Sequence, residues 1–264
     1  MAYLERINRY PVKSLDGESC GQAVVLASGA VDHDRRFAIF DAAGEVVNGK
    51  RTDAAHRLRS VYDPLKRTLS LRLHDAAAGE TFDLDRQRTE LERWLADYFE
   101  LPEGVRLLEN AEAGFPDDTQ SPGPTVLSTA TLQTVAGWYD GLTTDEVRKR
   151  FRPTLEIGGV EPFWEERLFG EVGQAVEFQV GAVRFAGVNP CPRCVVPTRW
   201  AATGQVGPDA AFAKTFAERR RQTLPNWANA SRFDHFYYLA VNTRLATPGQ
   251  GGRISVGDVV AIAS

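Results

Sequence analysis

Short apolar runs separated by turn residues dominate residues 1–85 of the chain. Runs of this length, bounded by Gly, Pro, Asp and Asn, are typical of β-strands. The tetrapeptide Asp41-Ala42-Ala43-Gly44 lies between two of the runs and predicts a hairpin turn. Examples of the strands predicted for this part of the chain are Leu4–Tyr10, Ala23–Leu26, Arg36–Phe40, Glu45–Val47 and Thr68–Leu73.

Helical spacing of apolar residues begins further along the chain and predicts a helix over Thr89–Phe99. Ser128 is a capping residue for a second helix, Thr129–Tyr139. Thr143 and Glu146 have the capping-box spacing, which predicts a third helix over residues 144–150. Pro, Gly, Asp and Ser accumulate between the first two helices, so residues 114–124 are predicted as a loop.

The rest of the chain returns to strand patterns with one helix inserted. Strands are predicted at Leu155–Ile157, Val176–Val180, Ala182–Val188, His235–Val241 and Val259–Ile262, and a basic helix at Pro208–Gln222. Many short strands with inserted helices predict an α+β fold that is rich in β-barrels. We expect two domains, residues 1–85 and 86–264, with the boundary between residues 80 and 125.

Composition and charge exclude several classes of protein. Hydrophobic residues make up 43% of the 264 and charged residues 25%, which is ordinary for a soluble protein with a sizeable core. Three cysteines do not fit a disulfide framework and indicate a reducing compartment. A net charge of −4 gives no reason to expect a nucleic-acid partner. The charged start and the lack of a run of about 18 apolar residues predict a cytoplasmic protein without a membrane partner.

Two of the three cysteines lie in one tetrapeptide, Cys191-Pro192-Arg193-Cys194. A structural zinc site needs about two more ligands, and the four histidines are scattered. A thioredoxin-like dithiol lies at the N-terminus of a helix. Pro197 counts against such a helix here, because the residue before a proline favours extended backbone. The two cysteines could also be buried as small apolar groups. That alternative does not explain Arg193 between them, since an unpaired arginine is costly to bury. A further chemistry is a single thiolate, Cys194, on a soft metal beside an anion that Arg193 balances.

Three other segments place basic side chains near hydroxyl groups or in extended backbone. They are Tyr10-Pro11-Val12-Lys13-Ser14, Asp34-Arg35-Arg36-Phe37 and Phe151-Arg152-Pro153-Thr154. Each segment alone is typical of solvated surface charge. Together they indicate a phosphate-bearing anion, because arginine binds phosphate as a planar fork and lysine binds it as a point charge.

This set of segments resembles the MOSC family, and more closely its two-part branch, which includes the mitochondrial amidoxime-reducing components and the bacterial YcbX-like proteins. The similarity covers nearly the whole chain, because the segment from Gly29 to Phe37 and the closing run Ile254-Ser255-Val256-Gly257-Asp258 also look like family elements. The resemblance implies a MOSC β-barrel, an N-terminal β-barrel-like domain and inserted helices.

The resemblance also implies a site. In the family, the cysteine after the arginine coordinates the molybdenum of a pyranopterin cofactor, which makes Cys194 the implied metal ligand and catalytic residue. Basic and hydroxyl residues hold the pterin and its phosphate, and Arg36 is implied as a neighbour. The implied cofactor-binding residues are Lys13, Ser14, Arg35, Ser121, Arg152, Pro192, Arg193 and Cys194.

Two positions depart from the family pattern. Thr154 stands where the family often has asparagine, which alters one implied hydrogen bond to the pterin. Pro197-Thr198-Arg199-Trp200-Ala201 replaces a T-x-D-P stretch and changes a loop at the mouth of the site. The chain lacks the four cysteines of a [2Fe–2S] cluster and the length of a pyridoxal-phosphate domain, so neither cofactor is expected.

The implied function is a molybdenum-cofactor-dependent oxidoreductase that reduces small N-hydroxylated compounds. A separate iron–sulfur or flavin protein is then expected as the electron donor. Two alternatives remain open. The first is a carrier that binds or delivers molybdenum cofactor without turnover, which the altered loop after Cys194 favours. The second is a sulfur-carrier or thiol-redox protein that uses Cys191 and Cys194 together.

Overall fold

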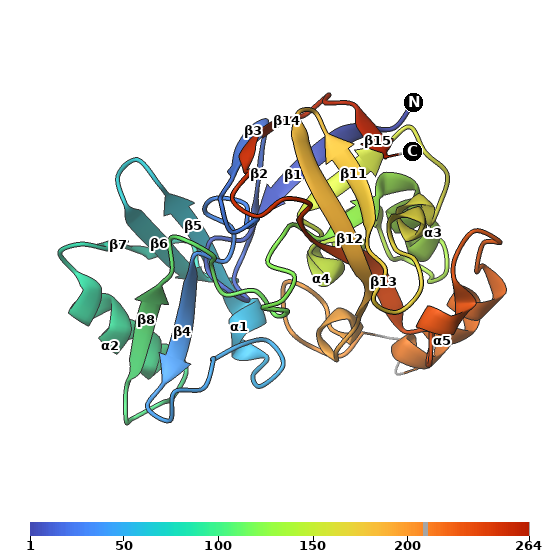
Figure 1. Ribbon diagram of the computed structural model, residues 1–264. Helices are drawn as coiled ribbons and strands as arrows, with labels where there is room; N and C mark the ends of the chain where they lie inside the picture. Colours follow the sequence, from blue (N-terminus) through green and yellow to red (C-terminus); the bar gives the residue numbers. More distant parts are fainter. Residues whose placement is uncertain (208–210, 264) are drawn as a thin grey trace.

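The computed structural model describes residues 1–207 and 211–263, which form fifteen β-strands and five α-helices. They are arranged as two lobes, a smaller one on the left of Figure 1 and a larger one on the right. Both chain termini lie on the larger lobe, where Leu4 N donates to Asp258 O at 2.8 Å. No helix in the described residues is both long enough and apolar enough to cross a membrane.

An eight-stranded sheet forms the frame of the larger lobe and combines strands from both ends of the chain. Its members, in spatial order, are β15 (Val260–Ile262), β11 (Val176–Val180), β12 (Val183–Pro192), β13 (Tyr238–Leu245), β9 (Val126–Ser128), β10 (Leu155–Gly158), β1 (Tyr3–Arg9) and β2 (Glu18–Cys20). A separate pair joins β3 (Gln22–Val25) to β14 (Gly252–Ser255).

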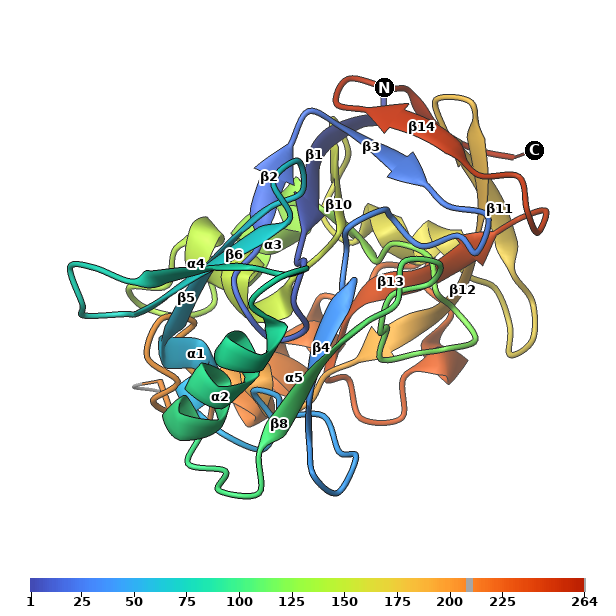
Figure 2. The same cartoon turned by 90° about the vertical axis from the view of Figure 1, so that its left-hand side faces the viewer.

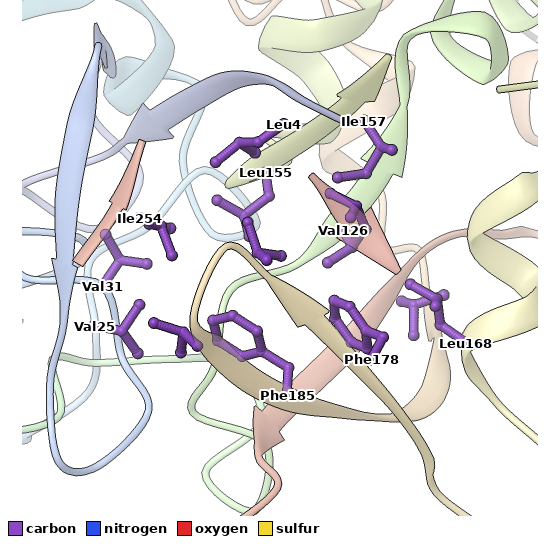
Figure 3. Packing of buried hydrophobic residues seen from close by; sticks show 14 of the residues in the cluster. Leu4, Val25, Val31, Val126, Leu155, Ile157, Leu168, Phe178, Phe185 and Ile254 are labelled. Atoms are coloured by element: carbon purple, nitrogen blue, oxygen red, sulfur yellow. The ribbon is translucent and has the colours of Figure 1, made fainter. Parts of the chain in front are cut away.

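The core of this lobe is filled from both ends of the chain. Leu4 and Val25, on the first strands, pack in one cluster with Ile254 near the C-terminus (Figure 3). Phe178 and Phe185 stack at the centre of the same cluster, with 5.5 Å between their ring centroids. The start of the chain therefore helps to build the lobe that carries the cysteine run. The division of the sequence into residues 1–85 and 86–264 stays a prediction.

The smaller lobe has its own core, built from residues 12–107. One pair of strands joins β4 (Phe37–Asp41) to β8 (Val105–Glu109), and α2 (Arg88–Tyr98) lies beside β8 (Figure 2). The remaining elements of this lobe are β5 (Leu58–Asp63), β6 (Thr68–Leu73), β7 (Glu80–Asp83) and the short α1 (Ala54–Arg57).

Two helices of the larger lobe begin where the sequence predicts. The Ser128 hydroxyl caps α3 (Thr129–Ala136) by accepting from Thr131 N, and the Thr143 hydroxyl caps α4 (Thr144–Phe151) by accepting from Glu146 N. A third core cluster packs both helices against α5 (Phe212–Gln222). Three short 3-10 helices, η1 to η3, span Trp164–Leu168, Val196–Thr198 and Ala230–Arg232.

The predicted α+β class is confirmed, and in the described residues the strands form four hydrogen-bonded sheets rather than a closed barrel. The strand predicted at Glu45–Val47 is wrong, because Val46 makes only an isolated bridge to Phe40. The turn before it does form, with Gly44 N donating to Asp41 O at 3.0 Å. The strand predicted to begin at His235 begins at Tyr238. Residues 208–210 of the predicted basic helix lie outside the described residues.

Two adjacent carboxylates, Glu165 and Glu166, are buried in η1. Glu166 pairs with the fully buried Arg220 of α5. No cation within the described ranges pairs with Glu165, whose carboxylate accepts from Ser128 N and Thr131 Oγ1 at 3.2 Å each. Burial, together with the charge of Glu166, raises the pKa of Glu165 to about 7.

The raised pKa of Glu165 predicts that stability falls as the pH rises. The carboxyl binds its proton more tightly in the folded chain than at its ordinary pKa of 4.5, so its stabilising contribution is complete below pH 4.5. That contribution is lost as the pH rises through about 7. Urea denaturation should show that the free energy of unfolding of the wild type falls by roughly 2–3 kcal/mol between pH 5 and 8. In Glu165→Gln the free energy of unfolding should change less over the same range. Equal slopes in both proteins would contradict the assignment.

Candidate functional site

One cavity of about 570 Å³ is lined by residues of both lobes, and all eight predicted site residues line it. Its size is in the range of small-molecule and cofactor sites. The eight residues come from segments that lie far apart in the sequence: Lys13, Ser14, Arg35, Ser121, Arg152, Pro192, Arg193 and Cys194. The structure therefore brings the predicted site together, and the role of each residue in holding a cofactor stays a prediction.

The segment after β1 crosses from the larger lobe to the smaller one and carries the first two site residues. Its backbone pairs with the start of β4, because Phe37 N donates to Pro11 O at 2.9 Å and Lys13 N donates to Phe37 O at 2.8 Å. Arg35 N also donates to Tyr10 O at 2.9 Å. These bonds place Lys13, Ser14 and Arg35 on the same wall of the cavity.

Two site arginines lie against the same aromatic ring. The guanidinium carbons of Arg35 and Arg152 are 5.3 and 4.0 Å from the centre of the Tyr10 ring. Tyr10 is 5% exposed, and burial raises its pKa to about 12, so the ring stays neutral. A neutral aromatic face attracts cations, and Tyr10 thereby holds both arginines at the cavity wall.

The buried carboxylate of Asp34 fixes Arg35. It pairs with the Arg35 guanidinium and accepts from Tyr10 N at 2.8 Å and from the Thr154 hydroxyl at 3.3 Å. Burial of Arg35 opposes its charge, but the Asp34 carboxylate outweighs burial, so the pKa of Arg35 is raised. Thr154, the residue that departs from the family pattern, therefore bonds to the groups that hold Arg35.

Arg152 has no such partner. Its Nη2 donates to Leu15 O at 2.7 Å, and no carboxylate in the described parts of the chain lies within ion-pair distance of it. Burial lowers the pKa of Arg152, and the neighbouring charge of Arg35 lowers it further. A partly buried guanidinium beside a second one, with a single carboxylate between them, favours binding of an additional anion.

The cysteine run lies at an irregularity in the pairing of β12 with β13. Pro190 pairs with Val241 and Pro192 with Tyr238, so β13 has one more residue than β12 across this step. Ala240, opposite Cys191, has a φ of 74°, a left-handed conformation that is rare for residues other than glycine. A β-bulge bends the strand and redirects its side chains, and here it lies beside the cavity.

Arg193 is held firmly between the two cysteines. Its backbone N donates to Tyr237 O at 3.0 Å, and its Nη2 donates to Phe151 O at 2.9 Å. Its Nη1 donates to Cys191 Sγ at 3.2 Å, while Nε is buried without a partner. Cys191 and Cys194 form no disulfide, and both are half-buried thiols in the cavity wall. The sulfur of Cys194 and a fixed positive charge therefore lie side by side in the chain.

Lys13 and Lys50 share the carboxylate of Asp117 in the cavity wall. Lys13 Nζ lies 2.9 Å from Asp117 Oδ1 and donates to Phe115 O at 3.0 Å, and Lys50 Nζ lies 3.7 Å from the same carboxylate. Burial works to raise the pKa of Asp117, but Lys13 and Lys50 outweigh it and lower the pKa to about 2. One ionised carboxylate therefore offsets only one of the two lysine charges.

Sequence reasoning missed several members of this site. Tyr10 and Asp34 stood inside the segments that pointed to the site, but nothing in a sequence shows that a tyrosine supports two arginines. Lys50 and Asp117 belong to no motif. Arg36, by contrast, does not line the cavity and pairs with Glu109 at 2.7 Å.

The donor set fits a large anionic group that carries its own metal. Cationic side chains, hydroxyls and the free thiol of Cys194 all line the cavity, and Arg193 of the same lining has a guanidinium nitrogen without a partner. Among residues 1–207 and 211–263, no group of three or more His, Cys, Asp or Glu could hold a metal ion. A metal at Cys194 would take its other ligands from a chelate that the cations hold.

Comparison with protein families gives two matches, and comparison with curated proteins gives none. The MOSC N-terminal beta barrel domain matches residues 1–102, and the MOSC domain matches residues 125–261. Together they cover both lobes and every predicted site residue except Ser121. The MOSC domain is associated with binding of the molybdenum cofactor. The chain belongs to the MOSC-domain family and carries the family's N-terminal barrel domain ahead of its MOSC domain.

Proposed function

We propose that this protein is a cytoplasmic molybdenum-cofactor-dependent reductase of small N-hydroxylated compounds. The observation that carries the proposal is the meeting of Cys194, Arg193 and the Tyr10-supported arginines in one cavity. The family to which the chain belongs is associated with the same cofactor, which supports the assignment of the cavity to it.

The proposal assigns a role to each predicted site residue. Cys194 binds the metal as a thiolate, and Arg193 balances negative charge beside it. Lys13, Ser14, Arg35 and Arg152 hold the phosphate of the pterin, and Ser121 and Pro192 contact the organic part. Bidentate arginines fix the orientation of a phosphate as well as its charge. The cofactor would therefore lie along the cavity, with its metal at Cys194 and its phosphate near Tyr10.

The bound cofactor supplies two-electron redox chemistry, and the protein supplies orientation and charge. Reduction of an N-hydroxyl group consumes two electrons and two protons and releases the amine and water. The Arg193 side chain is held by Phe151 O and by Cys191 Sγ, which fixes its positive charge in the cavity wall that also carries Cys194. We propose that a separate iron–sulfur or flavin protein delivers the electrons, because the chain has only three cysteines.

The metal assignment predicts different outcomes for the two cysteines. In protein purified from a host that makes the cofactor, elemental analysis should find molybdenum in the wild type and in Cys191→Ala. Cys194→Ala should lose most of it, because the thiolate is the proposed protein ligand. Equal molybdenum in all three proteins, or none in any of them, would sink the assignment.

Turnover separates the reductase from its alternatives. With a chemical reductant, the molybdenum-loaded wild type should convert an N-hydroxylated amidine to the amidine. Retention of molybdenum without turnover would identify a carrier instead. Equal loss of function in Cys191→Ala and Cys194→Ala would favour thiol chemistry, since that alternative needs both sulfurs.

Tyr10 should matter through its ring rather than through its hydroxyl. Tyr10→Leu removes the aromatic face from Arg35 and Arg152 and should weaken cofactor retention by roughly 5- to 30-fold, because two cation–π contacts of about 0.5–1 kcal/mol each are lost. Tyr10→Phe keeps the ring and should retain molybdenum at nearly the wild-type level. Metal content at matched protein concentration, with circular dichroism to confirm folding, measures both variants. A loss of equal size in Tyr10→Phe would refute the role of the ring.

A further inference from the structure

A second cavity of about 430 Å³ adjoins the first. The two cavities share four lining residues, Ser14, Arg150, Arg152 and Val196, and two of these, Ser14 and Arg152, are proposed to hold the cofactor phosphate. Neither Cys191 nor Cys194 lines the second cavity. Nothing in the proposed reductase chemistry uses this space.

Every carboxylate in the wall of the second cavity already has a cationic partner. Asp16 pairs with Arg59 at 3.1 Å, and Glu18 pairs with Arg9 at 2.7 Å. Asp145, the third, pairs with Lys149 at 2.7 Å. No negative charge in this wall is left to balance further cations.

Three arginines in the same wall have no carboxylate partner among residues 1–207 and 211–263. Arg6 donates only to the neutral amide of Asn8, at 2.9 Å. Arg152 donates only to a backbone carbonyl and lies against Tyr10. Arg199 makes no ion pair, and its Nε is buried without a hydrogen-bond partner. The second cavity thus has three uncompensated positive charges, a strong bias towards an anion with more than one negative charge.

The size and the remaining lining indicate what kind of anion fits. A bare phosphate would leave most of the volume unfilled. Val61, which is 67% exposed, and the half-buried Val196 also line the cavity and offer apolar surface to an organic group. We propose that the second cavity binds a nucleoside 5′-phosphate, with its phosphate between Arg152 and Arg199 and its nucleoside against these apolar residues.

Such a phosphate has two chemical sources. It is a free nucleotide that binds beside the cofactor, or it is the nucleotide half of a cofactor extended through a diphosphate linkage. Arg152 faces both cavities and suits either source, because one guanidinium can contact two neighbouring phosphates. The second source rests on the proposed function, and the first does not.

Titration calorimetry of the full chain, purified without cofactor, tests the site with guanosine 5′-monophosphate as the probe. The wild type should bind it saturably, and Arg199→Ala should bind it at least tenfold more weakly, because a charge-assisted hydrogen bond is lost. Arg184→Ala is the matched control, since that arginine is 60% exposed and lies outside both cavities. Guanosine, which lacks the phosphate, should not bind.

Two results would overturn the site. One is the absence of saturable binding to the wild type. The other is binding that Lys13→Ala weakens and Arg199→Ala does not, which would place the nucleotide in the first cavity. Acid release of nucleotide from the molybdenum-loaded protein then identifies the source: one nucleotide per metal atom indicates the extended cofactor, and none indicates a free nucleotide. If the protein binds the nucleotide but never retains molybdenum, the proposed reductase function is refuted and the nucleotide site is still supported.

Discussion

The site depends on an excess of positive charge held against one tyrosine ring. Arg35 and Arg152 lie on Tyr10 at 5.3 and 4.0 Å, and Asp34 compensates only the first of them. Two neighbouring cations repel each other, so this arrangement is least stable when no anion is bound. A ligand that binds the folded chain but not the unfolded chain stabilises the fold by mass action. An anion bound between these arginines would therefore stabilise the folded chain.

The backbone around these cations carries strain of its own. Ser14, Arg35 and Arg152 all have a left-handed φ, at 72°, 50° and 54°. Glycine would adopt this conformation more easily, but it would supply neither a hydroxyl nor a guanidinium. Each such residue costs on the order of 1–3 kcal/mol. The surrounding packing must supply that energy, and Val12 and the adjoining Leu15 are buried in the core of the smaller lobe.

The sequence predicted the parts of this structure that depend on local chemistry. β6 spans the predicted residues, and the caps at Ser128 and Thr143 form, because capping is a property of a few neighbouring residues. Short strands such as β2 and β9 were missed, since three residues are too few to show a periodic pattern. The same distinction applies to the site. Residues inside recognisable segments were found, whereas Lys50 and Asp117 reach the cavity only through the fold.

The construction of the larger lobe explains why the site needs both ends of the chain. β1 lies between β10 and β2 in the main sheet, and β3 pairs with β14 near the C-terminus. The crossing segment that follows β1 is therefore anchored in the same sheet as β12, which leads to the cysteines. If β1 left the sheet, Tyr10 and Lys13 would lose their fixed relation to Cys194. A cofactor that spans the cavity thus depends on the pairing of β1 with β10 and β2, which anchors the crossing segment in the sheet that carries Cys191.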